Sequence, residues 1–556
     1  EAAGDGAGET QEVRILRAFC LEGRMKRFSS MISLLEKADA SVVEKATEAV
    51  RALPAIRDCS DVDALSREVP PPDDPLLAST VEELRVRISD AQTTFDLGGV
   101  ETAIELANGI VEDANSIDDL AVRAEAKLLF GRFLHTSGKS KEAVTVLRDA
   151  IWASVASDYD VLAFESWNTL ADAFGAGDRE IGESEIAGRN AEAFWLRLDR
   201  DPFLGAKLFA QRGLTALSDV RLDETRELLN QALELLESSA YDDDPLEVRI
   251  LGGLAAANAK SGRLSEAVDL NRRAESLSAS LYGSLNPQTL SLQLNRGNMQ
   301  YLSGDYREAI ETHSDLLKKY EKLYGAEHKD TARTIFNLAV ENLALGNNEA
   351  ALGMLERAVA IRTSMLGATH PSTLRGEQAV VHTLKELERY DEAVERAQSV
   401  IAAQRATLGD EHYDIAYSLV TLSEIRGLQG RFEDGIRIGT EAAEMVARVM
   451  GPEHPFHGEA LTSLGVIYER AGERSLALGR FRSAIEGLKS YDGDATLIAK
   501  ARFHWAKAAW PDGDKREQAV QEARSAAETF ETRGKSAEKE LAEVRAWLES
   551  HRPAIQ

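Results

Sequence analysis

The sequence predicts an all-α protein in which helical pairs stack into a right-handed solenoid. Three observations point to this fold. Small residues recur every 42 residues along the second half of the chain, and only 13 of the 556 residues are Pro. Apolar residues within each repeat follow the 3.6-residue period of an α-helix. Stacked repeats can extend one core beyond roughly 250 to 300 residues, the length at which a single globular core stops growing.

Two ladders of small residues run in step through the repeats. The members of the glycine ladder are Gly283, Gly325, Gly367, Gly409, Gly451 and Gly493. The members of the second ladder are Ala267, Ala309, Ala351, Ala393, Gly435, Ala477 and Ala519. Because both ladders keep the same spacing, the register is expected to hold through at least six repeats without an insertion.

One repeat shows how each unit divides into two helices. Residues 331–345 place apolar side chains at helical spacing, and Gly346 is expected to end this first helix. Residues 349–366 form the second helix, and Gly367 is expected to supply a left-handed C′ position that closes it. Pro371 then opens the next first helix, where its missing N–H costs nothing.

The spacing inside the unit identifies the kind of helical repeat. The period alone fits a long tetratricopeptide unit or a HEAT/armadillo unit. However, a small first-helix residue lies 12 positions before the second-helix ladder, at Ala255, Gly297, Ala339, Ser423 and Gly465. The turn between the two helices carries an aromatic residue at one fixed position, namely Tyr306, Tyr390 or Phe432. This pattern resembles the tetratricopeptide repeat, in the 42-residue form seen in kinesin light chains and many bacterial regulators.

Weaker copies of the repeat extend the array upstream. We expect about eleven helical pairs over residues 76–532, with the regular repeats starting at about residue 245. Residues 11–68 do not follow the repeat, and two helices are expected there, at about 11–38 and 40–53. The remaining segments are expected to be a disordered lead at 1–10, a proline linker at 69–75, and a capping helix and tail at 533–556.

The charge and hydropathy of the chain narrow the class of partner. Its net charge is −28, from 93 acidic and 65 basic residues. A polyanion repels phosphate backbones and anionic lipid surfaces, so nucleic acid is not an expected partner. No run of 18 apolar residues occurs, so membrane insertion is not expected either. The acidity fits a solvated surface or a preference for basic partners.

No recognised catalytic or cofactor motif is present in the sequence. It lacks G-x-S-x-G, H-E-x-x-H and a Walker A run, so no enzyme activity and no cofactor are expected. Four loop histidines repeat with the period, namely His328, His370, His412 and His454. Zinc ligands lie about 2 Å from the ion, whereas equivalent points in successive repeats are separated by two helix packings of about 8–10 Å. We therefore expect no metal site, and each histidine should bond the turn beside it.

The first helix of each pair should line the concave wall of the solenoid. Polar residues at the wall-facing positions are Arg249, Asn295, Asn298, Arg333, Asn337, Arg375, Gln378, His382 and Lys385. Asn can both donate to and accept from a peptide backbone, and Arg pairs with carboxylates. We therefore expect a protein or an extended or acidic peptide as ligand. The alternative is a solvated polar lining without a defined ligand.

Part of this set resembles the carboxylate clamp of tetratricopeptide co-chaperones. The resembling residues are Asn298, Asn337 and Arg375. Leu294 and Ala379 occupy the two other clamp positions, which departs from the clamp pattern. The resemblance therefore supports peptide binding in general more than a complete clamp.

The N-terminal sequence resembles a segment of a second protein family. Residues 17–65, beginning RAFCLEGRMKRFSS and followed by VPPPDDP, resemble a segment of bacterial Hanks-type serine/threonine protein kinases, notably of myxobacteria. In that family the segment follows a kinase domain and a membrane span, and leads into tetratricopeptide repeats. The kinase motifs H-R-D and D-F-G are absent here.

The resemblance implies a non-catalytic sensor or docking region outside the cytoplasmic membrane. Because the chain begins with Glu1 rather than Met, we expect it to be a piece of a longer protein. The alternative is a free-standing cytoplasmic scaffold of the kinesin-light-chain type. A peptide-sensing regulator is a third interpretation, although no basic helix-turn-helix precedes the repeats.

The two cysteines of the chain, Cys20 and Cys59, are expected to face each other across the N-terminal hairpin. Two antiparallel helices joined near residue 39 would place both cysteines at similar positions along the helix axes. A bridge closing about 40 residues would contribute roughly 4 kcal/mol in the chain-entropy model. The alternative is two buried free thiols, which a cytoplasmic location would favour. The kinases that this segment resembles also carry further cysteines upstream, any of which could pair with Cys20.

Overall fold

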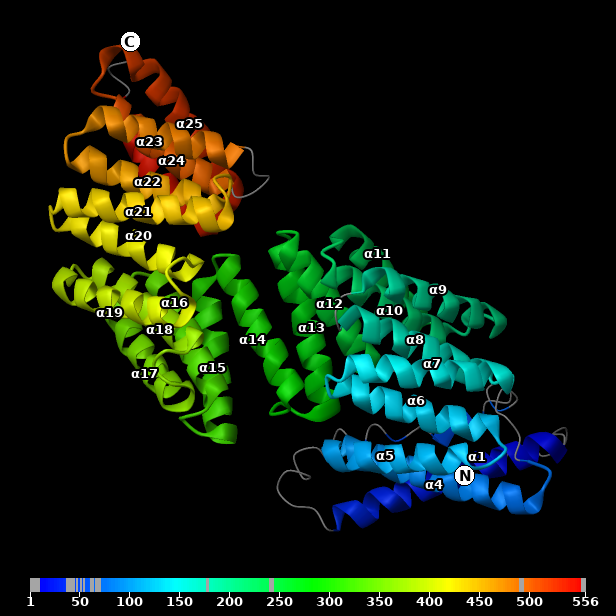
Figure 1. The fold of residues 1–556 in the computed structure, drawn as a ribbon. Helices are drawn as coiled ribbons and strands as arrows, with labels where there is room; N and C mark the ends of the chain where they lie inside the picture. The colour runs from blue at the N-terminus through cyan, green and yellow to red at the C-terminus, as the bar shows by residue number, and fades with distance from the viewer. Residues whose placement is uncertain are drawn as a thin grey trace. The chain divides into compact units, whose positions relative to one another are not determined.

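The computed structural model describes residues 11–36, 46, 49–50, 53, 56–60, 65 and 72–551, with gaps at 177–179, 240–244 and 490–494. These residues form helices and the turns between them, as predicted for an all-α chain. The chain divides into two compact units, Glu1–Gln293 and Leu294–Gln556. Figure 1 shows helices stacked in chain order within each unit.

Unit 1 contains the N-terminal helix and five helical pairs. The elements are α1 (Gln11–Leu35), the short 3₁₀ helix η1 (Ile56–Ser60), and the pairs α4 (Pro75–Asp96) with α5 (Val100–Asn115), α6 (Leu120–Thr136) with α7 (Ser140–Ala156), α8 (Asp160–Ala176) with α9 (Ile181–Arg197), α10 (Pro202–Ser218) with α11 (Leu222–Glu237), and α12 (Pro245–Lys260) with α13 (Leu264–Tyr282). The boundary between the units falls inside the next helix, α14 (Pro287–Leu302).

Unit 2 continues the pairs. They are α14 with α15 (Tyr306–Tyr324), α16 (Lys329–Ala344) with α17 (Asn348–Leu366), α18 (Pro371–Glu386) with α19 (Tyr390–Leu408), α20 (Tyr413–Leu428) with α21 (Phe432–Met450), α22 (Pro455–Arg470) with α23 (Arg474–Lys489), and α24 (Ala495–Ala509) with α25 (Arg516–Arg533), followed by α26 (Glu538–Ser550). The described part of the chain thus holds eleven pairs, which confirms the predicted number.

The N-terminal segment is described only in part. Its first helix is α1, Gln11–Leu35, and it contacts α4 and η1. Most of the second predicted helix, 40–53, lies outside the described residues, as do the lead at 1–10, residues 69–71 of the linker and the tail from 552. Pro75, which the sequence assigned to the linker, is instead the first residue of α4, because Asp74 caps that helix through its side chain.

The glycine ladder closes the second helices, but with a different backbone conformation from the one predicted. Gly367 has φ 92° and ψ 157°, and Gly283 has φ 95° and ψ 159°. The positive φ was expected, whereas the ψ values lie far from the left-handed helical region. These angles fall in an extended region that is essentially restricted to glycine. Gly493 lies outside the described residues.

The loop histidines cap the first helices. The Nδ1 atom of His370 accepts a hydrogen bond from the Ser372 N–H at 3.1 Å, and three other histidines make the same bond in their own repeats, namely His328, His412 and His454. Asn286 holds the equivalent position in the preceding repeat and accepts from the Gln288 N–H at 2.8 Å. The predicted bond to the adjacent turn is therefore an N-cap, which satisfies one otherwise unpaired helix N–H.

Replacing His370 with Ala should therefore lower the free energy of unfolding by about 1 kcal/mol, since the cap is lost. His370→Asn should retain most of the stability, because Asn286 performs this role in the same chain. Urea denaturation of both variants measures the difference. Equal losses for Ala and Asn would show that the imidazole contributes packing rather than a cap.

Small residues of the first helix face larger residues of the second helix within each pair. A Cβ atom added at Gly297 or at Gly465 would come within 3.0 Å of the ring of His313 or Phe481, respectively. Each ring residue follows its glycine by 16 positions. The sizes are reversed one repeat earlier, where a Cβ on Gly439 would meet Ser423. In each of these three pairs the helices can approach closely because one of the two facing residues is glycine.

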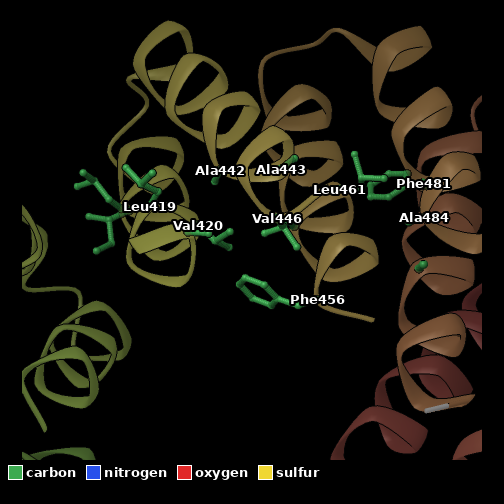
Figure 2. Close-up of a cluster of buried hydrophobic side chains, with 14 of the residues drawn as sticks. Leu419, Val420, Ala442, Ala443, Val446, Phe456, Leu461, Phe481 and Ala484 are labelled. Atoms are coloured by element: carbon green, nitrogen blue, oxygen red, sulfur yellow. The ribbon is translucent and has the colours of Figure 1, made fainter. Parts of the chain in front are cut away.

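The second ladder lies at the centre of these contacts. Ala351 and Ala393 are fully buried, and a Cβ on Gly435 would come 3.1 Å from the Ser423 carbonyl oxygen. Figure 2 shows part of the continuous core of unit 2, where Val446 lies near Phe456 and Leu461 lies beside Phe481. The core of unit 2 therefore runs along the stacked pairs, as a repeat array requires.

Ala351→Leu should overpack this contact and lower the free energy of unfolding by about 1–3 kcal/mol. Ala350, the preceding residue, is exposed and offers a matched control, because Ala350→Leu adds the same atoms on the solvent side. Thermal or urea denaturation compares the two variants. Similar stability of both would contradict close packing at the ladder.

Candidate ligand-binding face

Eight of the nine residues predicted to bind a ligand lie on the first helices of unit 2, and Arg249 lies in unit 1. Successive first helices contact each other, as seen for α18 with α20 and α20 with α22. Asn295, Asn298, Arg333 and Arg375 are exposed on this set of helices. Their side chains are therefore available to a ligand.

Two asparagines of the strip are already joined across neighbouring repeats. The Nδ2 group of Asn337 donates to Oδ1 of Asn298 at 2.9 Å. Arg333 pairs with Asp330 at 2.9 Å, one turn earlier on α16. The strip thus presents amide groups in a fixed arrangement, which lowers the entropy lost on binding a peptide backbone.

Gln378 does not belong to the exposed strip, which corrects the prediction. Its side chain is buried, and its Nε2 group donates to the Asp414 carbonyl oxygen at 3.1 Å and to Ser418 Oγ at 2.8 Å. Both acceptors lie on α20, in the next repeat. Gln378 therefore holds two repeats together, because the neighbouring first helix covers the position where it lies.

His382 and Lys385 are half-buried and interact with acidic neighbours. Burial alone would lower the pKa of Lys385, but Glu424 and Glu386 outweigh burial and raise this pKa above its usual value. The Lys385 ammonium lies 2.8 Å from Glu424. Burial and the nearby Lys385 lower the pKa of His382, so its imidazole is neutral at pH 7. Neither residue offers an uncompensated charge to a ligand.

An aromatic group that the sequence analysis missed extends the strip. Tyr413 is partly exposed, and its ring lies 5.3 Å from that of Phe456. Tyr417 stacks on the same Phe456 ring at 5.7 Å. Burial raises the pKa of Tyr413, and the positive charge of Arg375 opposes the increase, which places Arg375 near this ring. The signal in the sequence was the i, i+4 spacing of two tyrosines on a first helix.

Arg249 belongs to unit 1 and lies in a separate cleft. The cleft has a volume of about 480 Å³ and is lined by the first helices α4, α6, α8, α10 and α12. The sequence analysis identified Arg249 but not the other charged residues of this cleft, which include Arg132, Glu165 and Lys207.

Among the described residues, no helix is both long and apolar enough to cross a bilayer.

The repeats match a known family. The tetratricopeptide repeat model matches residues 288–364 and 414–490, and a second model with the same description matches residues 380–414. The chain therefore carries tetratricopeptide repeats, and its repeats form a protein-interaction scaffold. The matched segments lie in the regular half of the array, where the ladders of small residues are complete.

Relatives and solved structures resemble the chain over parts of its length. A clustered mitochondria protein homolog of Homo sapiens is 21% identical over 215 residues, which are 39% of this chain and 16% of that protein. The apo form of RapI covers 75% of this chain and 98% of its own, at a TM-score of 0.50 and 14% identity. A protein described as a kinesin light chain of Podosopora anserina covers 36% and 95%, at a TM-score of 0.34 and 25% identity.

Proposed function

We propose that this chain is the non-catalytic docking region of a receptor-like bacterial serine/threonine kinase and binds a protein or an extended, acidic peptide on the first helices of unit 2. The observation that carries the binding part is the strip of exposed Asn295, Asn298, Arg333 and Arg375, together with half-buried Asn337. In a chain with a net charge of −28, a strip with two arginines and three asparagines favours carboxylate-bearing ligands.

The proposed location is outside the cytoplasmic membrane. It is supported by the resemblance of residues 17–65 to the segment that precedes the repeats in such kinases. The pairing of Cys20 with Cys59 also supports it, since disulfides persist in oxidising compartments. The sequence of the gene upstream of Glu1 tests the kinase parent directly. A start codon directly before this segment would instead support the second candidate, a free-standing scaffold. The regular 42-residue repeats favour this second candidate.

Binding can be tested with an array of acidic and extended peptides. Arg333→Glu should weaken binding of acidic peptides by at least about tenfold, because a favourable charge becomes a repulsive one. Asn337→Ala should weaken it by roughly two- to tenfold through loss of one hydrogen bond. Binding should also weaken as salt is added.

A second-helix arginine in the same repeat provides the control. Arg357 on α17 is exposed to a similar degree as Arg333 and pairs with Glu321 at 2.7 Å. Arg357→Glu changes the net charge by the same amount but leaves the strip intact. Equal effects of the two reversals would indicate long-range electrostatics, and unchanged binding in both strip variants would place the site elsewhere.

A further inference from the structure

One side of α1 exposes a continuous stripe of apolar side chains. The helix contacts α4 and η1 through another side, where Cys20 and Met31 are buried. The α1 stripe consists of exposed Ala18 and four large side chains, namely Leu21 (39% exposed), Met25 (69%), Phe28 (55%) and Ile32 (42%). Scattered apolar side chains are normal on a protein surface, whereas a contiguous apolar patch usually marks an interaction surface.

The spacing of the α1 stripe is that of a two-helix coiled coil. Its members follow one another in steps of three and four residues, as positions a and d of a heptad do. A stripe of a and d positions alone is narrower than the face that a helix presents to a globular core. Two helices with the same spacing can interlock, because each apolar side chain enters a gap between four residues of the other helix. The spacing therefore favours an identical helix as the partner.

Charged residues beside the α1 stripe suit a parallel pair of helices. In such a pair, position g of one helix faces position e of the other, five residues further along. Arg17 holds a g position and Glu22 the e position five residues later, so a cation of each copy would face an anion of the other. Lys26 and Arg27 already pair with carboxylates of α4, which limits the repulsion between two copies.

The area of the stripe is sufficient for a weak dimer. With Ile15, which is 56% exposed and precedes the stripe by one turn, the exposed apolar side chains present roughly 500 Å² in one copy. Two copies would then bury about 1,000 Å², which is the lower limit for a specific interface. An interface of this size is expected to have a dissociation constant in the micromolar range.

We propose that α1 is a dimerisation helix, in which the α1 stripe packs in parallel against the same stripe of a second copy of this chain. The dimer needs only residues of α1, so it depends neither on the binding strip of unit 2 nor on a kinase parent. Two copies of the strip in one dimer would strengthen the binding of a ligand that presents two sites.

Sedimentation equilibrium of the full, unreduced chain at about 1–100 µM measures the association. The mass should rise from that of the 60.8 kDa monomer toward twice this value. Met25→Glu/Phe28→Glu should raise the dissociation constant at least about a hundredfold, because charged groups would be buried between the helices. Both side chains are exposed in the monomer, so the fold should tolerate the change, which circular dichroism checks.

Two residues of α7 provide a matched control. Trp152 and Val155 are 63% and 46% exposed and have the same i, i+3 spacing as Met25 and Phe28. Trp152→Glu/Val155→Glu adds the same charge to unit 1 and should leave the dissociation constant unchanged. Equal effects of the two double variants would overturn the proposal. A chain that stays monomeric at about 100 µM would also overturn it and would leave the stripe to a different partner.

A cysteine cross-link tests the parallel arrangement without adding charge. Cys20 and Cys59 are bonded to each other, so Ile32→Cys introduces a single free thiol. A parallel pair places the two copies of this thiol side by side, whereas an antiparallel pair centred on Met25 separates them by about 20 Å. Mild oxidation should therefore link two copies of Ile32→Cys but not of Val155→Cys. No link in Ile32→Cys, or equal linking of both variants, would overturn the parallel dimer even if the glutamate variant did not fold.

Discussion

Reducing the Cys20–Cys59 disulfide is expected to destabilise the N-terminal segment by about 4 kcal/mol in the chain-entropy model. The bond joins residues 39 positions apart, with a Cα–Cα distance of 5.6 Å. It therefore closes a loop that would otherwise be free in the unfolded state. Both cysteines are buried in a small cluster with Leu65, so few apolar contacts would replace the bond.

The contacts of α1 explain why the bond matters for this helix. Arg17 Nε donates to the Cys59 carbonyl oxygen at 3.1 Å. Farther along α1, Lys26 lies 2.5 Å from Glu82 and Arg27 lies 3.3 Å from Asp96, and both acceptors belong to α4. The ion pairs anchor the second half of α1, while the disulfide anchors the first half.

Hydrogen exchange of the full chain with and without reductant measures this effect. Reduction should raise amide exchange in α1 and leave the repeats of unit 2 unchanged, because repeats depend on their neighbours. A Cys20→Ala/Cys59→Ala variant should exchange rapidly in α1 whether or not reductant is present. Mass spectrometry of the unreduced protein gives a separate check: two thiols that alkylate freely would refute the bond.

The sequence predicted the helical pairs because their contacts repeat. Ala351 and its equivalents must stay small wherever two helices cross, so the spacing of small residues marks the crossings. The conformation of Gly367 was not predictable to the same degree. A glycine that ends a helix indicates a positive φ, whereas ψ depends on the path of the loop to the next helix.

The binding residues were harder to predict, because exposure depends on the neighbouring repeat. Helical spacing places Gln378 near Arg375, yet α20 of the next repeat covers Gln378 and leaves Arg375 exposed. In unit 1, Glu165, Lys207 and Arg249 line one cleft and are spaced by 42 positions, so the repeat register could have predicted that they meet. Arg132 and Asp172 line the same cleft but are 40 positions apart, so the register does not align them.

A buried ionisable pair in unit 2 leads to the second large effect. Nδ1 of His313 on α15 lies 2.5 Å from Oε1 of Glu341 on α16, and neither side chain is more than 1% exposed. The other carboxylate oxygen of Glu341 has no partner among the described residues. Burial raises the pKa of Glu341, and His313 opposes the increase. Burial raises the pKa of Tyr301, and the charges of Tyr306 and Glu341 add to the increase.

The sign of the pH dependence follows from the raised pKa. The folded state binds the Glu341 proton more tightly than the unfolded state does. The free energy of unfolding that this group contributes is therefore greatest below its ordinary pKa of 4.5, and it is lost as the pH rises through the folded-state pKa. Removing His313 alone would leave the buried carboxylate without its partner. His313→Phe should therefore lower the free energy of unfolding by about 3–5 kcal/mol at neutral pH.

The chain itself supplies the design that should restore stability. In a later repeat, Gly465 faces Phe481, and Ala509 occupies the position equivalent to Glu341, with both Phe481 and Ala509 fully buried. The double variant His313→Phe/Glu341→Ala recreates this apolar arrangement opposite Gly297 and should recover most of the loss.

Urea denaturation at several pH values tests both variants against the wild type. The deficit of His313→Phe should shrink as the pH falls toward 4.5 and Glu341 becomes protonated. A deficit that is independent of pH, or that persists in the double variant, would show that the cost comes from steric misfit of the phenyl ring and not from the buried charge.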